Sequence, residues 1–334
     1  MNFHLLLNRC HCDYRCIFCT MGSEAHRAEQ EAILADFDWE AERERIDQIL
    51  TAASHCPGAD ALHIMGNDPC NQPDLLGIIE RARALGFRRI VLETNALKLA
   101  DPDVAAQLVD AGVHSFKIPV YGSSAEVHDE IVRLPGAFRR LQHAFDNLRA
   151  LPVDVRLHAL ILRQNVADLA QCRFPFPLSF RFPFAHDRAD FAYEHYAPRL
   201  RDVAPTVLAL SDLVIPCITG QLARDLPREE RARPEAPTER DDDANVVLVR
   251  PSCCSPSVCR QFDRCRGIYR CYLRTYGEDE FRHRSRWAAS FAIGLARATA
   301  QLTIKPSGTR ANRRAGIGRA ALLAIDRLRR WERR

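Results

Sequence analysis

The residues with the clearest chemical potential are cysteines, which gather at two places in the chain. The first group has the sequence Cys12-Asp-Tyr-Arg-Cys16-Ile-Phe-Cys19, a C-x3-C-x2-C spacing directly after an apolar run. The chain has 13 cysteines and begins with no segment typical of a secretory signal. Clustered thiols in such a chain are more typical of metal ligands than of disulfides. They therefore predict a metal-binding, cytoplasmic protein.

The spacing of the first cysteine group permits three interpretations. Cys12, Cys16 and Cys19 are spaced i, i+4 and i+7, so they would share one face of a helix and fill a core. With Cys10 as a fourth thiolate, the group would form a structural zinc site. Alternatively, the three thiolates would hold a 4Fe–4S cluster, which normally takes four, and leave one iron open. An open iron that binds a ligand and passes it one electron is suited to radical chemistry.

Alternating strand-like and helix-like segments would position these cysteines. Strands are expected at 3–8, 61–65, 88–94, 113–121, 153–162 and 178–184, and helices at 39–53, 73–86, 101–112, 126–151 (interrupted at Pro135-Gly136) and 165–171. This alternation predicts a parallel sheet with helical crossovers. Six units are fewer than the eight of a closed barrel, so we expect an α/β protein with a partial (β/α)6 TIM-like barrel. Functional groups on such a fold lie at the carboxyl ends of the strands.

The composition indicates a folded protein with three regions. Hydrophobic residues make up 47% of the 334 residues, which excludes a disordered chain, and no apolar run is long enough to span a membrane. Residues 1–186 would form the partial barrel, and residues 187–280 a Cys-rich extension that begins with a helix over 187–213. Residues 281–334 form a basic tail, predicted to be partly helical, with 14 Lys and Arg against 2 Asp and Glu. The tail would dock on the acidic body or on an acidic partner, and nothing else in the sequence favours nucleic acid.

Several motifs resemble the radical S-adenosylmethionine (radical SAM) superfamily. That family has C-x3-C-x-aromatic-C after its first strand, as at Cys12–Cys19 with Phe18 as the aromatic residue. Further matches follow later strands: Gly66-Asn67-Asp68-Pro69, where the family usually has Gly-Gly-Glu-Pro, then Thr94-Asn95, His128-Asp129, Pro135-Gly136-Ala137-Phe138 and Asn165. Ala96 stands where a glycine often follows Thr-Asn. The resemblance covers residues 3–184.

The resemblance implies a cofactor set and a reaction. Cys12, Cys16 and Cys19 would hold the 4Fe–4S cluster, and the methionyl amine and carboxylate of S-adenosylmethionine (SAM) would bind its open iron. A reductant such as flavodoxin or ferredoxin would supply one electron. SAM would then be cleaved to methionine and a 5′-deoxyadenosyl radical, which abstracts hydrogen from the substrate. The substrate would be a ribosomal peptide or a small natural product.

The same resemblance assigns residues to SAM. Gly66, Asn67 and Asp68 would line the methionyl amine, with Thr94 and Asn95 nearby. Arg156 would meet the carboxylate, Asn165 would lie near the ribose and Phe18 near the adenine. Taken singly, Arg156 equally fits a surface strand and Thr94-Asn95 a turn.

Two side chains are candidates to act at the radical site. Tyr121 follows the fourth predicted strand, and His128 lies at the start of the following helix. Packing for Tyr121 and an exposed helix start for His128 are the alternatives. His63, in an apolar strand, is interpreted as a core histidine.

The late cysteines resemble the auxiliary-cluster extension of some radical SAM families. The ligands implied are Cys217, Cys254, Cys259 and Cys265, with Cys253 and Cys271 as alternates. They would hold a second 4Fe–4S cluster. Zinc suits four thiolates equally well, and thiols without a metal also remain open.

The sequence therefore favours a radical SAM enzyme with a second cluster. One alternative is a non-catalytic iron–sulfur or zinc protein, that is, an electron carrier or a metal-stabilised binding module. Another is a radical SAM enzyme of cofactor or RNA modification.

Overall fold

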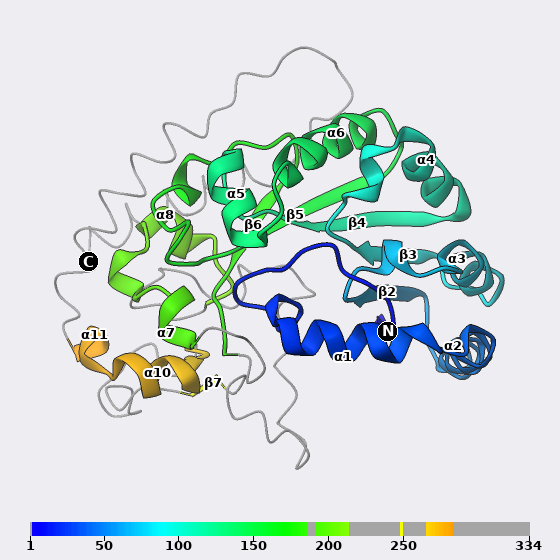
Figure 1. Ribbon diagram of the computed structural model, residues 1–334, viewed down its shortest axis with the longest axis horizontal. Helices are drawn as coiled ribbons and strands as arrows, with labels where there is room; N and C mark the ends of the chain where they lie inside the picture. The colour runs from blue at the N-terminus through cyan, green and yellow to red at the C-terminus, as the bar shows by residue number, and fades with distance from the viewer. Residues whose placement is uncertain (1, 186–191, 214–247, 250–264, 283–334) are drawn as a thin grey trace, which may run out of the picture. The chain divides into compact units, whose positions relative to one another are not determined.

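The computed structural model describes residues 2–185, 192–213, 248–249 and 265–282 (Figure 1). The chain divides between Ala197 and Pro198 into two compact units, which are described separately. The first unit contains the early cysteines and all strands of the larger sheet.

The first unit is built on a six-stranded parallel sheet whose strands follow one another in chain order. The strands are β1 (Asn2–Leu7), β2 (Ala61–Gly66), β3 (Arg89–Glu93), β4 (Val113–Pro119), β5 (Asp154–Leu160) and β6 (Leu178–Arg181). Pairs such as Leu7 with Gly66 bring neighbouring carboxyl ends to one edge. β1 and β6 lie at the sheet edges, so the predicted partial α/β barrel is confirmed.

Helices connect the strands of the first unit. They are α1 (Glu24–Ala35), α2 (Trp39–Ser54), α3 (Leu75–Ala84), α4 (Pro102–Ala111), α5 (Ala125–Val132), α6 (Ala137–Arg149) and the short α7 (Tyr193–Tyr196). Figure 1 shows α2, α3, α4 and α6 along the outer side of the sheet. Sequence analysis did not predict α1. Its start is marked by Ser23, whose hydroxyl accepts from the N–H of His26 at 3.4 Å, and its only large apolar residues are the adjacent Ile33 and Leu34.

The two faces of the sheet differ in polarity because strand side chains alternate. Residues such as Ile64, Leu92 and Phe116 face the helices and are fully buried. The alternate residues, including His63 and Glu93, are only partly buried. We call this second surface the inner face of the sheet.

The interruption predicted at Pro135-Gly136 is present, and it separates α5 from α6. The side chain of Asp129 stabilises it. α5 ends at Arg133, which adopts a left-handed conformation with φ 52°. The Asp129 carboxylate then accepts the N–H groups of Gly136 at 2.6 Å and Phe138 at 2.7 Å. Because these are otherwise unpaired amides at the start of α6, Asp129 caps that helix.

The second unit contains short elements. They are α8 (Pro205–Ala209), the antiparallel pair β7 (Leu248–Val249) and β8 (Ile268–Tyr269), α10 (Arg270–Tyr276) and α11 (Asp279–Arg282). The hydroxyl of Tyr272 accepts the N–H of Leu200 at 2.9 Å and donates to Glu280. The continuous helix predicted over 187–213 is wrong, since the described part of that segment forms short turns separated by Pro198 and Pro205.

Most of the late cysteines and of the basic tail fall outside the described residues. Cys217, Cys253, Cys254, Cys259 and residues 283–334 belong to this group. Cys265 and Cys271 are described, and both are buried. None of the helices in the described ranges is long and apolar enough to cross a membrane.

The Asp129 cap gives a test of the fold. Asp129→Ala should lower the free energy of unfolding by about 1–2 kcal/mol, because the amides at the start of α6 lose their acceptor. Urea unfolding would measure this loss. The matched control is Asp146→Ala on α6, whose side chain is 74% exposed and lies 4.0 Å from Arg149. Equal effects of the two substitutions would contradict the capping role.

Candidate functional site

The early cysteines lie in a loop that follows β1, which we call the cysteine loop (residues 10–22). Between Cys12 and Cys19 the chain is not helical, so the interpretation of one helix face is wrong. Cys12 and Cys16 are buried, and Cys19 is partly exposed. Burial and the neighbouring Cys19 and Cys12 raise the pKa of the Cys16 thiol well above its usual value. The three thiols are therefore near enough to influence one another.

The backbone of the cysteine loop is bonded to the end of α5. The N–H of Arg15 donates to the carbonyl of Val132 at 2.9 Å, and that of Ile17 to Ile131 at 3.1 Å. These carbonyls belong to the last turn of a helix, where the helix itself offers no donors. Gly22 closes the loop, since a Cβ there would lie 2.2 Å from the carbonyl oxygen of Cys16. The conformation of the cysteine loop therefore depends on Gly22 and on the free carbonyls at the end of α5.

Aromatic side chains pack together next to the cysteine loop. The rings of Phe18 and Tyr121 lie 5.3 Å apart, and Tyr121 lies 5.6 Å from His128. The N–H of Tyr121 donates to Nδ1 of His128 at 3.2 Å, so the neutral ring carries its proton on Nε2, 3.3 Å from the Tyr14 hydroxyl. That hydroxyl donates to the carbonyl of Asn95 at 3.4 Å. Burial lowers the pKa of His128 to about 4, which keeps it neutral.

The segment after β2 packs against the start of the cysteine loop. Gly66 adopts φ +144°, and a Cβ there would lie 2.3 Å from the carbonyl oxygen of Leu7. The Asn67 side-chain amide donates to the carbonyls of Asn8 and Cys10, each at 3.1 Å. Asn67 therefore ties the two carboxyl ends together, a contact that glycine could not make.

Asp68 is a fully buried carboxylate at the same edge of the sheet. The hydroxyl of Thr94 donates to it at 2.6 Å, and among the described residues no cation forms an ion pair with it. Burial raises the pKa of Asp68 to about 6. The Thr94 oxygen also accepts the N–H of Ala96 at 3.1 Å, which supports the positive φ of 65° at Ala96.

Two other predicted residues are engaged in local contacts. The Asn165 amide donates to the carbonyls of Tyr121 and Leu160, both at 2.9 Å, so it joins the segments that follow β4 and β5. Arg156 is exposed on β5, and its Nε lies 3.2 Å from the Asp154 carboxylate. The structure therefore gathers the cysteine loop, Gly66–Asp68, Thr94, Asn95, Tyr121 and His128, whereas Arg156 lies on the surface.

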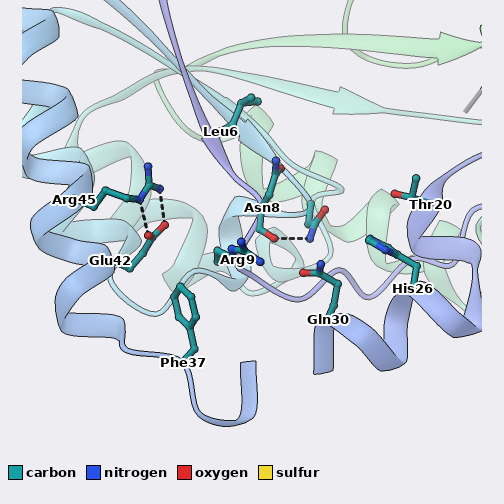
Figure 2. Close-up of a pocket in the computed structure, with 10 residues that line it drawn as sticks. Leu6, Asn8, Arg9, Thr20, His26, Gln30, Phe37, Glu42 and Arg45 are labelled. Carbon is teal, nitrogen blue, oxygen red and sulfur yellow. Dashed lines mark hydrogen bonds and ion pairs between the residues drawn. The ribbon is translucent and has the colours of Figure 1, made fainter. Parts of the chain in front are cut away.

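A pocket of about 680 Å³ opens beside the cysteine loop (Figure 2). Its lining is Leu6, Asn8, Arg9, Thr20, His26, Gln30, Phe37, Glu42, Arg45 and Asn67. Figure 2 shows Glu42 and Arg45 of α2 joined by two hydrogen bonds, both 2.7 Å. The volume lies in the range of small-molecule sites, and Thr20 directly follows Cys19.

Sequence reasoning missed a set of ionisable residues on the inner face. His63, interpreted above as a core residue, lies 3.1 Å from the Glu93 carboxylate. Lys117 donates to the same carboxylate at 2.8 Å. The available signal was the alternation of the predicted strands, which places His63, Glu93 and Lys117 on one face.

The surroundings of the cysteine loop bear on the zinc interpretation. In the described ranges, no three Cys, His, Asp or Glu side chains are arranged to hold one metal ion. A single zinc ion requires every thiolate within about 2.3 Å of one point, whereas a cluster takes each thiolate on a different iron. Cys10 is directed elsewhere, since its Sγ lies 3.1 Å from the carbonyl oxygen of Leu7. This contact gives no support to Cys10 as the fourth ligand of a zinc site.

Comparison with known families agrees with this geometry. Residues 10–172 match the family model of the Radical SAM superfamily. This segment is a radical SAM domain. It includes the cysteine loop, Asp68 and α5, and the superfamily predicted from the motifs is confirmed. Members of this superfamily use a 4Fe–4S cluster and SAM.

Relatives of the radical SAM domain include two curated enzymes. The AdoMet-dependent heme synthase of Methanosarcina barkeri is 24% identical over 160 residues, 48% of this chain and 42% of that protein. Mycofactocin maturase MftC of Mycobacterium ulcerans is 31% identical over 111 residues, 32% of this chain and 29% of that protein. The chain therefore spans less than half the length of these relatives.

A solved structure extends the similarity of fold beyond the domain. Native anSMEcpe with bound AdoMet superposes with a TM-score of 0.52 at 13% identity, covering 90% of this chain and 97% of that one. At this identity the comparison shows a shared fold.

Ionisation of the buried Asp68 carboxylate lowers the free energy of unfolding, and this loss can be measured. Its pKa is raised from 3.8 to about 6, so the cost of ionising it is absent below about pH 4 and complete above about pH 6. In the cluster-free protein, Asp68→Asn should therefore raise the free energy of unfolding by about 2–3 kcal/mol at pH 7.5 and little at pH 4. Urea unfolding at the two pH values measures the difference.

Asp110 is exposed on α4, and Asp110→Asn is therefore the control. Its effect on the free energy of unfolding should be the same at the two pH values. A gain in stability from Asp68→Asn that is equal at both pH values would contradict the assignment of the cost to ionisation.

Proposed function

We propose that this protein is a radical SAM enzyme that cleaves SAM reductively and abstracts a hydrogen atom from a peptide or a small natural product. Cys12, Cys16 and Cys19 would hold the 4Fe–4S cluster. When bound, such a cluster supplies the electron that cleaves SAM to methionine and a 5′-deoxyadenosyl radical. The observation that carries the proposal is the cysteine loop itself, which holds the thiols of Cys12, Cys16 and Cys19 within the segment that matches the Radical SAM family model, the first two buried and the third partly exposed.

Asp68 supports the binding of a cationic group next to the cysteine loop. It is a buried carboxylate without a cationic partner in the described part of the chain, and such a group is stabilised when a cation pairs with it. We assign the methionyl amine of SAM to this position, with Gly66 and Asn67 beside it. Thr94 would keep the carboxylate oriented through its hydrogen bond.

The aromatic residues would shape the rest of the SAM site. Phe18 lies on the cysteine loop against Tyr121, and we assign the adenine to its neighbourhood. Asn165 would act by fixing the carbonyl of Tyr121, to which its amide donates. His128 is fully buried and neutral, so it would keep Tyr14 and Tyr121 in place, while Tyr121 stays the candidate nearest to the reacting atoms.

A second 4Fe–4S cluster is part of the proposal. Cys217, Cys254, Cys259 and Cys265 would be its ligands, and of these only Cys265 lies in the described residues, where it is buried. Zinc at these cysteines is the alternative. A flavodoxin or ferredoxin would supply the reducing electron.

The substrate class has a second candidate. The matched heme synthase favours modification of a cofactor, whereas the matched mycofactocin maturase favours a maturation reaction. Either substrate class is compatible with the proposed abstraction of a hydrogen atom.

The test is anaerobic reconstitution followed by addition of SAM and a reductant. The protein should release 5′-deoxyadenosine and bind about eight irons, four for each cluster. The variant with Cys12→Ala, Cys16→Ala and Cys19→Ala should release none and lose about four irons. Cys56→Ala, at a partly exposed cysteine outside the loop, should behave as the parent protein.

Two outcomes would change the proposal. Reconstituted protein that carries the first cluster but forms no 5′-deoxyadenosine with several reductants would favour an electron carrier. About four irons in the parent protein, all lost in the triple variant, would mean that the late cysteines hold zinc or no metal.

A further inference from the structure

The inner face of the sheet carries an ionisable side chain on each of its six strands. We call this set the inner-face cluster. Its members are His4 of β1, His63 of β2, Glu93 of β3, Lys117 of β4, His158 of β5 and Arg181 of β6. Their positions follow from strand alternation and register, since Glu93 pairs with Lys117 and His158 lies two residues beyond the partner of Lys117.

Glu93 lies at the centre of the cluster. Besides Lys117 at 2.8 Å and His63 at 3.1 Å, His158 Nε2 lies 3.7 Å from its other oxygen. Burial alone would raise the pKa of Glu93, but the contacts with these three groups hold it well below its usual value. Glu93 is therefore ionised, and its charge is balanced by that of Lys117.

The β5–β6 side of the cluster contains polar atoms without partners. Within the described residues, Nδ1 of His158 and Nε of Arg181 are buried and form no hydrogen bond. Burial lowers the pKa of His158 to about 3, so the ring is neutral, and no carboxylate forms an ion pair with Arg181 in this part of the structure. Since buried polar groups are normally paired, a ligand that hydrogen-bonds to these two atoms would be stabilised here.

The charges specify the kind of ligand. Lys117 and Glu93 balance each other, the His158 ring is neutral, and burial also lowers the pKa of His4. Arg156, on the same face, is paired with Asp154, so Arg181 leaves one positive charge that no carboxylate of the described residues balances. One negative charge on the ligand would balance it, whereas a doubly charged phosphate would leave one charge unpaired beside Glu93. A guanidinium also presents paired N–H groups that match a carboxylate.

The cluster remains reachable from solvent. The side chains of Glu93, Lys117 and His158 are 23%, 20% and 13% exposed, and Arg181 is also partly exposed. Glu93 directly precedes Thr94, which bonds to Asp68 at the carboxyl edge of the sheet. A ligand held on the inner face would thus extend toward the proposed SAM site.

We propose that Arg181 and His158 bind a carboxylate of the substrate, and that Glu93 is a positioning residue that holds Lys117 and His63 around it. This inference rests on the proposed function and deepens it, because it makes the substrate a carboxylate-bearing molecule. Arg181 supplies the charge, and His158 donates its Nδ1–H from the neighbouring strand, since its Nε2 lies 3.7 Å from Glu93, beyond hydrogen-bond distance.

The experiment uses 3,3,3-trifluoropropionate as the probe, titrated into the reconstituted full-length protein and followed by fluorine NMR. The carboxylate should bind and its uncharged amide should not. Arg181→Gln should weaken binding roughly tenfold or more, because a charge-assisted hydrogen bond is lost. Arg149→Gln, at an exposed position on α6, is the matched control and should leave binding unchanged.

Release of 5′-deoxyadenosine without substrate is measured on the same samples. Arg149→Gln should keep this release, since the residue is exposed on α6 and belongs to neither proposed site. His158→Gln is the second variant and should also weaken binding, so the test stands even if Arg181→Gln does not fold. A failure of the parent protein to form 5′-deoxyadenosine, with carboxylate binding intact, would count against the proposed function alone.

Three results would overturn the inference. They are no binding of the carboxylate by the parent protein, equal binding of carboxylate and amide, and binding of inorganic phosphate tighter than that of the carboxylate.

Discussion

The arrangement of the site depends on the backbone bonds between the cysteine loop and the last turn of α5. Arg15 and Ile17 donate to carbonyls that the helix leaves unpaired, so the loop is placed by the end of a helix. That end is in turn fixed by the left-handed Arg133 and by Asp129, which caps α6. Because thiols bind a cluster only when they point to a common space, these contacts determine whether the loop can act.

The fold could be predicted from sequence because its signals are local and repeated. Apolar runs alternate with helical segments, and each predicted strand of the sheet is present within a few residues. α1 was not predicted because its only large apolar residues are the adjacent Ile33 and Leu34, and the cap at Ser23 is a weak signal for its start. The helix predicted over 187–213 was wrong because Pro198 and Pro205 divide the described part into short turns.

The site was only partly predictable for a similar reason. The cysteine spacing and the motifs after each strand identify residues that lie at the carboxyl edge. The tie made by Asn67 to Asn8 and Cys10 depends on three-dimensional contacts that no spacing reveals. The inner-face cluster joins residues from six strands, and its meaning depends on which atoms lack partners. Atoms without hydrogen-bond partners can be identified only when distances and burial are known.

The central claim is that three thiolates hold a cluster whose fourth iron binds SAM. Mössbauer spectroscopy of protein reconstituted with iron-57 tests it most directly. The account predicts one iron site whose isomer shift changes when SAM is added, and no such site in the Cys16→Ala variant. Spectra that SAM leaves unchanged, in protein carrying the full cluster, would contradict the claim.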